Sequence, residues 1–551
     1  MRQRRTSDGL TVQAIAGTHV VTLGMDLAEH ARKGCIGFAI RRTDHTEQET
    51  TWLRGMKTFP TVEPNPGPGA SVSSRRHPFQ AFQWADYSAK PGYDYSYEVI
   101  ALGRPVADPV ELRSVTVRVT TESEDSGTHS VYFNRGSVAS QEYARRFLDI
   151  KPSKLTGAPQ EAAYAWLSRG LLEALIRFIE RAKAGDQLSG AFYEFQWPEV
   201  LSAIRRASAR GVDVHIVYDG IGDTSTCRKN EAAISTAKVK GLCTARTTGS
   251  LMHNKFLVLS KKRRPIAVWT GSTNLTENGI FGHSNCGHIV EDAGIAAAYQ
   301  AYWGELRTNP TRKAETAALE ALNPMPPTAW DQDLVAVFSP HDSQAVLDWY
   351  ARIAASAKGA LFMAFAFGMH DLFKNVYRSD DDVLRIALMD KEARRASDSG
   401  EIAAIEAIRR RWNVLVAVGN KIETNAFDRW LAEMGGLTSN VQWIHTKFML
   451  VDPLGPTPVV ITGSANFSEP STDANNENML VIRGDTRVAD IYVGEYLRLY
   501  AHYAFRESVA RSAERGDETW TPQNLVEGVG WQAPHYRRGD RALRRRYFAG
   551  T

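Results

Sequence analysis

One set of residues occurs twice in this chain, in register. The first copy contains His253-Asn254-Lys255 followed by Gly271-Ser272-Thr273-Asn274, and the second contains His445-Thr446-Lys447 followed by Gly463-Ser464-Ala465-Asn466. Corresponding residues lie 192 positions apart (445 − 253 = 192). A repeat that keeps its internal spacing over this distance indicates two similar folded units in one chain.

Each copy is flanked by short apolar runs. Residues 256–259 and 267–270 in the first copy, and residues 448–451 and 459–462 in the second, are typical of buried strands bounded by turns. Residues i and i+2 of a strand share a face, so the histidine and the lysine of each copy should point the same way. The Gly-Ser turn that ends the next strand would bring a hydroxyl and backbone N–H groups to the same place. Together these groups can hold a phosphate and break one of its ester bonds.

The duplicated pattern resembles the signature of the phospholipase D superfamily, which is H-x-K-x4-D followed by G-S-x-x-N. The second copy is complete, because Asp452 stands at the acidic position. The first copy departs from the family there, since its matching residue is Ser260. The resemblance covers roughly residues 160–550.

A second acidic position also differs between the copies. Residues 475–481 resemble the family's acidic segment behind the site and contain Glu477. When the first copy is aligned with a one-residue gap, Cys286 falls in that place. The segment therefore predicts a carboxylate partner for His445, supplied by Glu477 and Asp452, and none for His253.

The order of helical and strand-like segments predicts two α/β halves. From about residue 160, amphipathic helical stretches alternate with strand-like runs such as residues 212–218 and 413–418. The predicted fold class is α/β, with two phospholipase D-like α/β sandwich halves and mixed sheets, over residues 126–325 and 326–551. The proline-rich stretch 323–328 is the predicted linker between them.

Residues 1–125 form a separate predicted unit. Strand-like runs at residues 36–40, 93–100 and 114–119 are separated by turns rich in glycine and proline. Strands with this spacing predict an all-β accessory domain, a sandwich loosely similar to immunoglobulin or fibronectin folds. This domain offers a surface for a protein partner, which the sequence does not identify.

Composition limits the compartment and the partners. The net charge is +4, and six arginines lie between residues 537 and 546 against one aspartate. A solvated basic tail is one interpretation, and a tail that packs or contacts phosphate through its interleaved aromatic residues is the other. Four cysteines without metal-ligand spacing indicate free thiols, with a Cys227–Cys243 bridge as the alternative. No signal peptide or membrane-spanning run is recognisable, so we expect a cytoplasmic protein rather than a secreted lipase.

The resemblance implies a phosphodiesterase that forms a covalent phosphohistidine and needs neither a metal nor a cofactor. One imidazole attacks phosphorus, the other protonates the leaving oxygen, and the lysines and asparagines stabilise the negative charge. Because the predicted carboxylate partners would keep His445 protonated, His445 is the expected general acid and His253 the expected nucleophile. The predicted catalytic residues are His253, Lys255, Asn274, His445, Lys447 and Asn466, with Ser272, Ser464, Asp452 and Glu477 in support.

Three functions remain open at this stage. The basic charge balance, the arginine-rich tail, the expected compartment and the extra β domain favour a nuclease that acts on nucleic acid. A phospholipase D or transphosphatidylase acting on phospholipids would need apolar loops around the site, for which residues 279–281 and 365–369 are candidates. A non-catalytic binding module of the same fold is the third function, and the intact histidine–lysine pairs argue against it.

Overall fold

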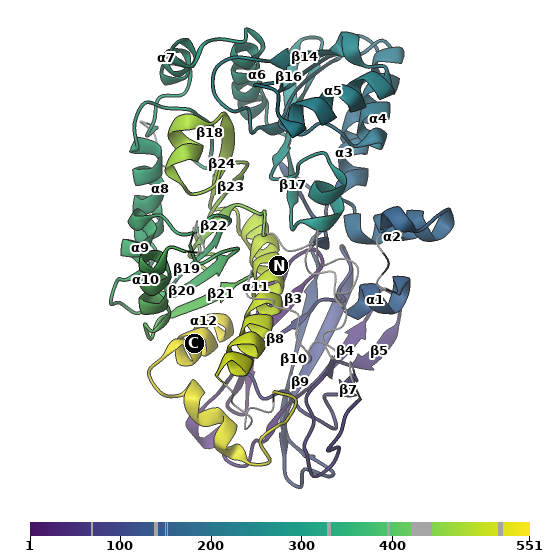
Figure 1. Cartoon of the computed structure of the whole chain (residues 1–551). Helices are drawn as coiled ribbons and strands as arrows, with labels where there is room; N and C mark the ends of the chain where they lie inside the picture. Colours follow the sequence, from purple (N-terminus) through teal and green to yellow (C-terminus); the bar gives the residue numbers. More distant parts are fainter. Residues whose placement is uncertain are drawn as a thin grey trace.

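The structure is a computed structural model, and it describes residues 1–67, 70–136, 141–148, 150, 152–327, 332–393, 397–419, 444–515 and 522–551. It contains an N-terminal region of antiparallel sheets and two seven-stranded mixed sheets (Figure 1). Thr328, at the end of the predicted linker, lies outside the described residues. No helix in these ranges combines the length and the apolar character that crossing a bilayer requires.

The N-terminal region has two four-stranded antiparallel sheets, with the orders β1-β2-β3-β8 and β10-β9-β4-β5. The strands are β1 Arg2–Ser7, β2 Leu10–Ala16, β3 Val21–Leu27, β4 Gly37–Asp44, β5 Glu49–Trp52, β8 Gln83–Asp86, β9 Asp94–Gly103 and β10 Val110–Thr120, beside a small pair of β6 Arg54–Gly55 and β7 Val72–Ser73. Val115, Val117 and Val119 of β10 are buried between exposed polar residues and join a core made by both sheets. The predicted all-β region is confirmed, whereas its likeness to immunoglobulin or fibronectin folds stays a prediction.

The first α/β half is built on a sheet of order β11-β17-β16-β15-β12-β13-β14. Its strands are β11 His129–Phe133, β12 Gln187–Phe192, β13 Asp213–Asp219, β14 Cys243–Arg246, β15 Lys255–Lys261, β16 Arg264–Gly271 and β17 Cys286–Val290. Its helices are α1 Gln141–Phe147, α2 Ala158–Ser168, α3 Leu171–Glu180, α4 Pro198–Ala209, α5 Ser225–Ala237, α6 Ala293–Arg307 and α7 Arg312–Leu322. The strands β12, β13 and β14 are parallel and are joined through α4 and α5, whereas β15, β16 and β17 are antiparallel.

The second half repeats this arrangement, with the order β18-β24-β23-β22-β19-β20-β21. Its strands are β18 Leu334–Ser339, β19 Ala360–Phe365, β20 Leu384–Met389, β21 Val414–Val418, β22 Phe448–Val451, β23 Val459–Gly463 and β24 Glu477–Arg483. Its helices are α8 Ala345–Ala355, α9 Asp371–Tyr377, α10 Ser399–Arg409, α11 Thr486–Glu514 and α12 Asp540–Ala549. The prediction of two mixed α/β halves is therefore confirmed.

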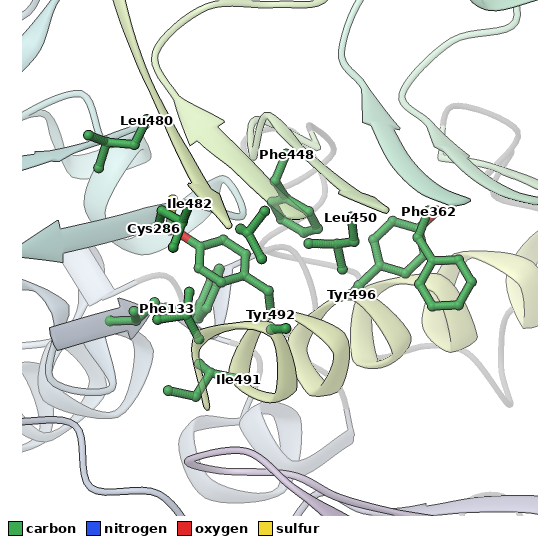
Figure 2. Close-up of a cluster of buried hydrophobic side chains, with 14 of the residues drawn as sticks. Phe133, Cys286, Phe362, Phe448, Leu450, Leu480, Ile482, Ile491, Tyr492 and Tyr496 are labelled. Atoms are coloured by element: carbon green, nitrogen blue, oxygen red, sulfur yellow. The ribbon is translucent and has the colours of Figure 1, made fainter. Parts of the chain in front are cut away.

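One hydrophobic cluster joins the two halves. Phe133 of β11, Phe448 of β22 and Tyr492 of α11 are in mutual ring contact, with centroid separations of 5.2 to 6.4 Å. Figure 2 shows Tyr492 and Tyr496 rising from α11 toward Phe448 and Phe362. Since all of these side chains are buried in one continuous core, the sheets are held in a fixed relation to each other.

The basic C-terminal segment packs against the N-terminal sheets. Helix α12 lies on β3, where Phe548 is fully buried and Arg545 forms an ion pair with Asp26. The packed interpretation of the tail is therefore the correct one. Four arginines of the segment still face solvent, namely Arg537, Arg538, Arg541 and Arg546.

Asp452 has a structural role away from the imidazoles. Its carboxylate accepts hydrogen bonds from the backbone N–H groups of Lys358, Gly359 and Ala360 at 2.9, 2.6 and 2.9 Å. Asp452 follows the last residue of β22, whereas Lys447 precedes its first, so the two lie about 16 Å apart along the strand. The expectation that Asp452 supports His445 is therefore wrong. The Ser260 departure lies at the corresponding distant end of β15.

We expect Asp452→Asn to lower the free energy of unfolding by about 2 kcal/mol, because hydrogen bonds to a charged acceptor are lost. Urea denaturation measures this change. Ser260→Ala is the matched control, since the buried Ser260 hydroxyl has no hydrogen-bond partner among the described residues. Equal effects of the two substitutions would contradict this role for Asp452.

Candidate functional site

The two sequence motifs meet through a pair of short backbone bridges between the halves. Met252 pairs with Asn476, and Ser284 pairs with Ile444, both in parallel orientation. The two bridges are equivalent, because Met252 and Ile444, and Ser284 and Asn476, are each 192 positions apart. The His253 N–H also donates to the carbonyl of Asn476 at 3.0 Å. Each histidine is thus held against a segment of the opposite half, which is Asn476-Glu477 for His253 and Ser284-Asn285 for His445.

The imidazoles of His253 and His445 face each other with ring centroids 6.4 Å apart. Lys255 is the first residue of β15, and Lys447 directly precedes β22. Each lysine is 1% exposed and donates through Nζ to the carbonyl of the histidine in its own half. Burial lowers the pKa of Lys255 to about 8 and that of Lys447 to about 7. The predicted convergence of both histidines and both lysines on one place is present in the structure.

Glu477 bonds to the histidine of the opposite half. Its carboxylate oxygens lie 2.8 and 2.9 Å from His253 Nδ1, and its side chain is 1% exposed. The expectation that Glu477 serves His445 is therefore wrong, because the bridges between the halves exchange the partners. Burial lowers the pKa of His253, and the charge of Glu477 opposes this effect.

Asn285 takes the same position beside His445. Its Oδ1 lies 2.8 Å from His445 Nδ1, while its Nδ2 donates to the Gly279 carbonyl at 2.7 Å. Because Oδ1 can only accept, His445 Nδ1 carries the proton and Nε2 faces the site. Burial, and then Lys447, lowers the pKa of His445 well below its usual range.

The one-residue gap that aligned Cys286 with Glu477 is wrong. Gly271 pairs with Gly287 and Gly463 pairs with Met479, so the offset of 192 continues through this segment. Asn285 is therefore the counterpart of Glu477, and an amide replaces the carboxylate. The Cys286 side chain instead points into the shared hydrophobic core (Figure 2), where it is fully buried. All four cysteines are free thiols.

The two Gly-Ser turns hold the segments that contain Asn285 and Glu477 in place. Ser272 Oγ donates to Asn285 Oδ1 at 2.8 Å, and Ser464 Oγ accepts from the Asn478 N–H at 3.0 Å. Asn274 lies beside Glu194, which accepts a hydrogen bond from it. Asn466 occupies the equivalent turn position, but the structure does not bring it into hydrogen-bond contact with either imidazole. The Oδ1 atoms of both asparagines are buried without a hydrogen-bond partner among the described residues.

Two buried aspartates that sequence reasoning missed position the motifs. Asp219 accepts from the Met252 N–H at 3.1 Å, and Asp390 accepts from the Ile444 N–H at 3.0 Å. Burial raises the pKa of each to about 6. Asp219 is the last residue of β13 and Asp390 directly follows the equivalent strand β20, and this shared placement is the signal that could have identified them.

Further groups lie beside the imidazoles. The His283 ring is 5.7 Å from that of His445, and burial lowers its pKa to about 4. The Tyr193 ring is 5.1 Å from that of His253. Within the ranges that the structure describes, no group of three or more His, Cys, Asp or Glu side chains is arranged to hold a metal ion. Metal independence stays a prediction.

The family model described as "Cardiolipin synthase, PLD-like domain" matches residues 175–307 and 380–499, one segment in each half. The chain therefore contains two domains of the phospholipase D superfamily. Its two phospholipase D-like halves account for both sequence motifs. No curated protein matches the chain.

Several solved structures are similar to part of this chain. The polyphosphate kinase of Porphyromonas gingivalis is 11% identical, with 58% of this chain and 46% of the kinase covered and a TM-score of 0.35. The phospholipase D family member Nuc from Salmonella typhimurium is 21% identical, with 31% of this chain and 94% of Nuc covered and a TM-score of 0.23. Yeast tyrosyl-DNA phosphodiesterase is 10% identical, with 57% of this chain and 88% of the yeast protein covered and a TM-score of 0.32. The match thus spans less than half of the kinase.

The lysines should make anion binding depend on pH. Since burial lowers their pKa values to about 7 and about 8, both positive charges are lost as pH rises past these values. We expect sulfate to lose roughly 10-fold or more in affinity between about pH 6 and about pH 9, because its own charge does not change there. Isothermal titration measures the affinity, and proton uptake on binding near neutral pH is the expected sign. A sulfate affinity that stays the same over this pH range would contradict the assignment.

Proposed function

We propose that this chain is a phosphodiesterase that works through a covalent phosphohistidine, with nucleic acid as the preferred substrate. The observation that carries the proposal is the approach of His253 and His445, one from each half, to a ring separation of 6.4 Å beside two buried lysines. In-line displacement at phosphorus needs a nucleophile on one side and a proton donor on the other. Two facing imidazoles fit these two roles.

His253 is the better nucleophile of the pair. Attack by Nε2 on phosphorus leaves a positively charged imidazole ring whose Nδ1–H faces Glu477 at 2.8 Å. The buried carboxylate stabilises that charge. The Nδ1 atom of His445 faces the neutral Asn285 instead of a carboxylate, so its imidazolium is the stronger acid and gives up its proton more readily. The roles assigned from the sequence are retained, although the reason for them has changed.

The reaction then has two balanced steps. In the first, the bond from His253 Nε2 to phosphorus forms while the phosphorus–oxygen bond to the leaving group breaks. His445, which takes up a proton at Nε2 as the diester anion binds beside it, supplies that proton to the leaving oxygen. In the second, His445 takes a proton from water, the resulting hydroxide attacks phosphorus, and His253 leaves. Lys255 and Lys447 neutralise the phosphate oxygens in both steps, and the bound anion in turn keeps both ammonium groups charged.

Trapping the intermediate tests these roles. A p-nitrophenyl leaving group needs no proton, so His445→Asn should still react with bis(p-nitrophenyl) phosphate and accumulate the adduct. We expect a burst of one p-nitrophenolate per site and, after a denaturing alkaline quench, phosphorylation mapped to His253 by mass spectrometry. The matched variant His253→Asn should give no burst.

A label on His445 in the His253→Asn variant would reverse the assignment. Full turnover by both histidine variants would rule out the phosphohistidine mechanism. No reaction of the unmodified protein with any diester would favour the non-catalytic binding module.

Two features of the protein support nucleic acid over phospholipid. Most residues of the loops that could have formed an apolar rim are buried, since Ile280, Phe281, Phe365 and Met369 are 1 to 3% exposed, whereas Phe367 is 47% exposed. Four solvent-facing arginines on the C-terminal segment add positive surface that suits a polyanion. Phospholipid remains the second candidate, because Leu251 near His253 is 39% exposed.

We expect the protein to cleave single- or double-stranded DNA or RNA with EDTA present, and to cleave phosphatidylcholine vesicles much more slowly. Product analysis on gels and by thin-layer chromatography compares the two classes under one set of conditions. The His253→Asn variant controls for contaminating enzymes. Cleavage of lipid alone would replace the nuclease proposal with the phospholipase one.

A further inference from the structure

A buried ion pair lies behind the bridge that holds His253. Arg246, the last residue of β14, is fully buried, and its guanidinium donates to Glu315 of α7 at 2.6 Å. Glu315 is 1% exposed and also accepts from the Ser250 N–H at 3.4 Å. Removing either charge would leave the other buried without its partner, so the two side chains are held together. Neither residue takes part in the proposed reaction directly.

Asn476 closes the ion pair into a triangle of hydrogen bonds. Its Oδ1 accepts from Arg246 Nε at 3.2 Å, and its Nδ2 donates to Glu315 Oε1 at 2.7 Å. Its backbone forms the bridge with Met252 and accepts from the His253 N–H at 3.0 Å. Because the amide is bonded through both of its ends, the ion pair fixes Asn476. We call Arg246, Glu315 and Asn476 the charged clamp.

Glu477 follows Asn476 directly and is the partner of His253. Its carboxylate oxygens lie 2.8 and 2.9 Å from His253 Nδ1. On the other side of the bridge, Asp219 accepts at 3.1 Å from the backbone N–H of the residue before His253, and it pairs with Arg246 in the sheet. The charged residues of β13, β14 and α7 therefore fix both sides of one bridge, and with it the carboxylate beside the imidazole.

The second half has no equivalent of the charged clamp among its described residues. The register of β20 and β21 continues to place Gly419 beside Asp390. In the first half, Arg246 pairs with Asp219 at the equivalent place. At the other bridge, Ser284 has a hydroxyl that is buried without a hydrogen-bond partner in the described chain. The charged clamp thus stands only behind the histidine that has a carboxylate partner.

We propose that the charged clamp positions Glu477 against His253 and so prepares this histidine for attack on phosphorus. The inference rests on the proposed function, in which His253 is the nucleophile. Attack leaves a positive charge on the imidazole, and the carboxylate stabilises that charge best when its distance and angle are fixed in advance. Arg246 and Glu315 are positioning residues, because they act through Asn476 and Glu477. The step that depends on them is the attack, whereas binding of the phosphate depends on the lysines.

Burst kinetics in the His445→Asn background isolate this step, since its product is the adduct on His253. We expect Arg246→Met to slow the burst with bis(p-nitrophenyl) phosphate roughly 10- to 100-fold, because small misplacements of reacting groups have effects of this size. Asn476→Ser keeps the ion pair and introduces the residue of the other bridge, and it should also slow the burst. Isothermal titration should show unchanged sulfate affinity in both variants, which a general disruption of the site would not allow.

Arg169→Met is the matched control. Arg169 is a buried arginine of the same half, and it pairs at 2.8 Å with Glu495 of α11 instead of with a bridge residue. We expect this substitution to lower the thermal unfolding temperature, as Arg246→Met does, but to leave the burst rate unchanged. The positioning role is overturned if neither clamp variant slows the burst, if burst rate and sulfate affinity fall in proportion, or if Arg169→Met slows the burst equally. The phosphodiesterase proposal stands in each of these cases.

If the His445→Asn protein without a clamp substitution gives no burst, the phosphohistidine proposal fails by itself. NMR titration of labelled histidine then decides the positioning role. We expect Asn476→Ser to lower the pKa of His253 relative to the unmodified protein, because the charge of Glu477 raises this pKa and would be held less closely. An unchanged pKa of His253 would overturn the inference.

Discussion

The two parallel bridges between the halves are the interaction on which the site depends. The Met252–Asn476 bridge places the segment that contains Glu477 behind His253. The Ser284–Ile444 bridge places the segment that contains Asn285 behind His445. Glu477 thereby reaches His253, and Asn285 reaches His445. Neither half alone contains both a histidine and the side chain that bonds to its Nδ1 atom. Any change that separates the two sheets would therefore disrupt both imidazoles at once, even though each fold could remain intact.

This arrangement buries positively charged side chains, which is unfavourable while no anion is bound. Lys255 and Lys447 are both buried, and burial lowers the pKa of each. A bound phosphate supplies the negative charge that the site lacks, so the groups are already oriented before substrate arrives and become stabilised when it binds. Asp219 and Asp390 add no direct contact with the imidazoles, but each fixes the backbone that carries one of them. The shared hydrophobic core that joins the two halves then keeps the distances between these groups constant.

Much of the fold was predictable from residues close together in the sequence. The apolar runs beside each motif gave the central strands, and the constant offset of 192 gave the repeated half. The partners of the imidazoles were not predictable in this way, because they depend on contacts across the halves. A gap in the alignment led to Cys286, although the strand register places Asn285 beside His445. Asp452 belongs to the family signature, yet it bonds to the backbone at the distant end of its strand.

Packing of the C-terminal segment was one of two interpretations of the sequence, but its place in the fold was beyond sequence reasoning. Six arginines in ten residues read as a solvated tail, but the interleaved Leu543 and Phe548 bury against other parts of the chain. The charged residues form only the outer face of that helix. The apolar residues determine where the helix lies, and strand β3, on which the helix packs, is more than 500 positions away in the sequence.

The central claim is that both imidazoles act on one shared phosphate, and a crystal structure with bound orthovanadate tests it most directly. The account predicts a single vanadate between the halves, bonded to His253 Nε2, with its opposite apical oxygen within hydrogen-bond distance of His445 Nε2. Vanadate bound at one motif alone, or to no histidine, would contradict it.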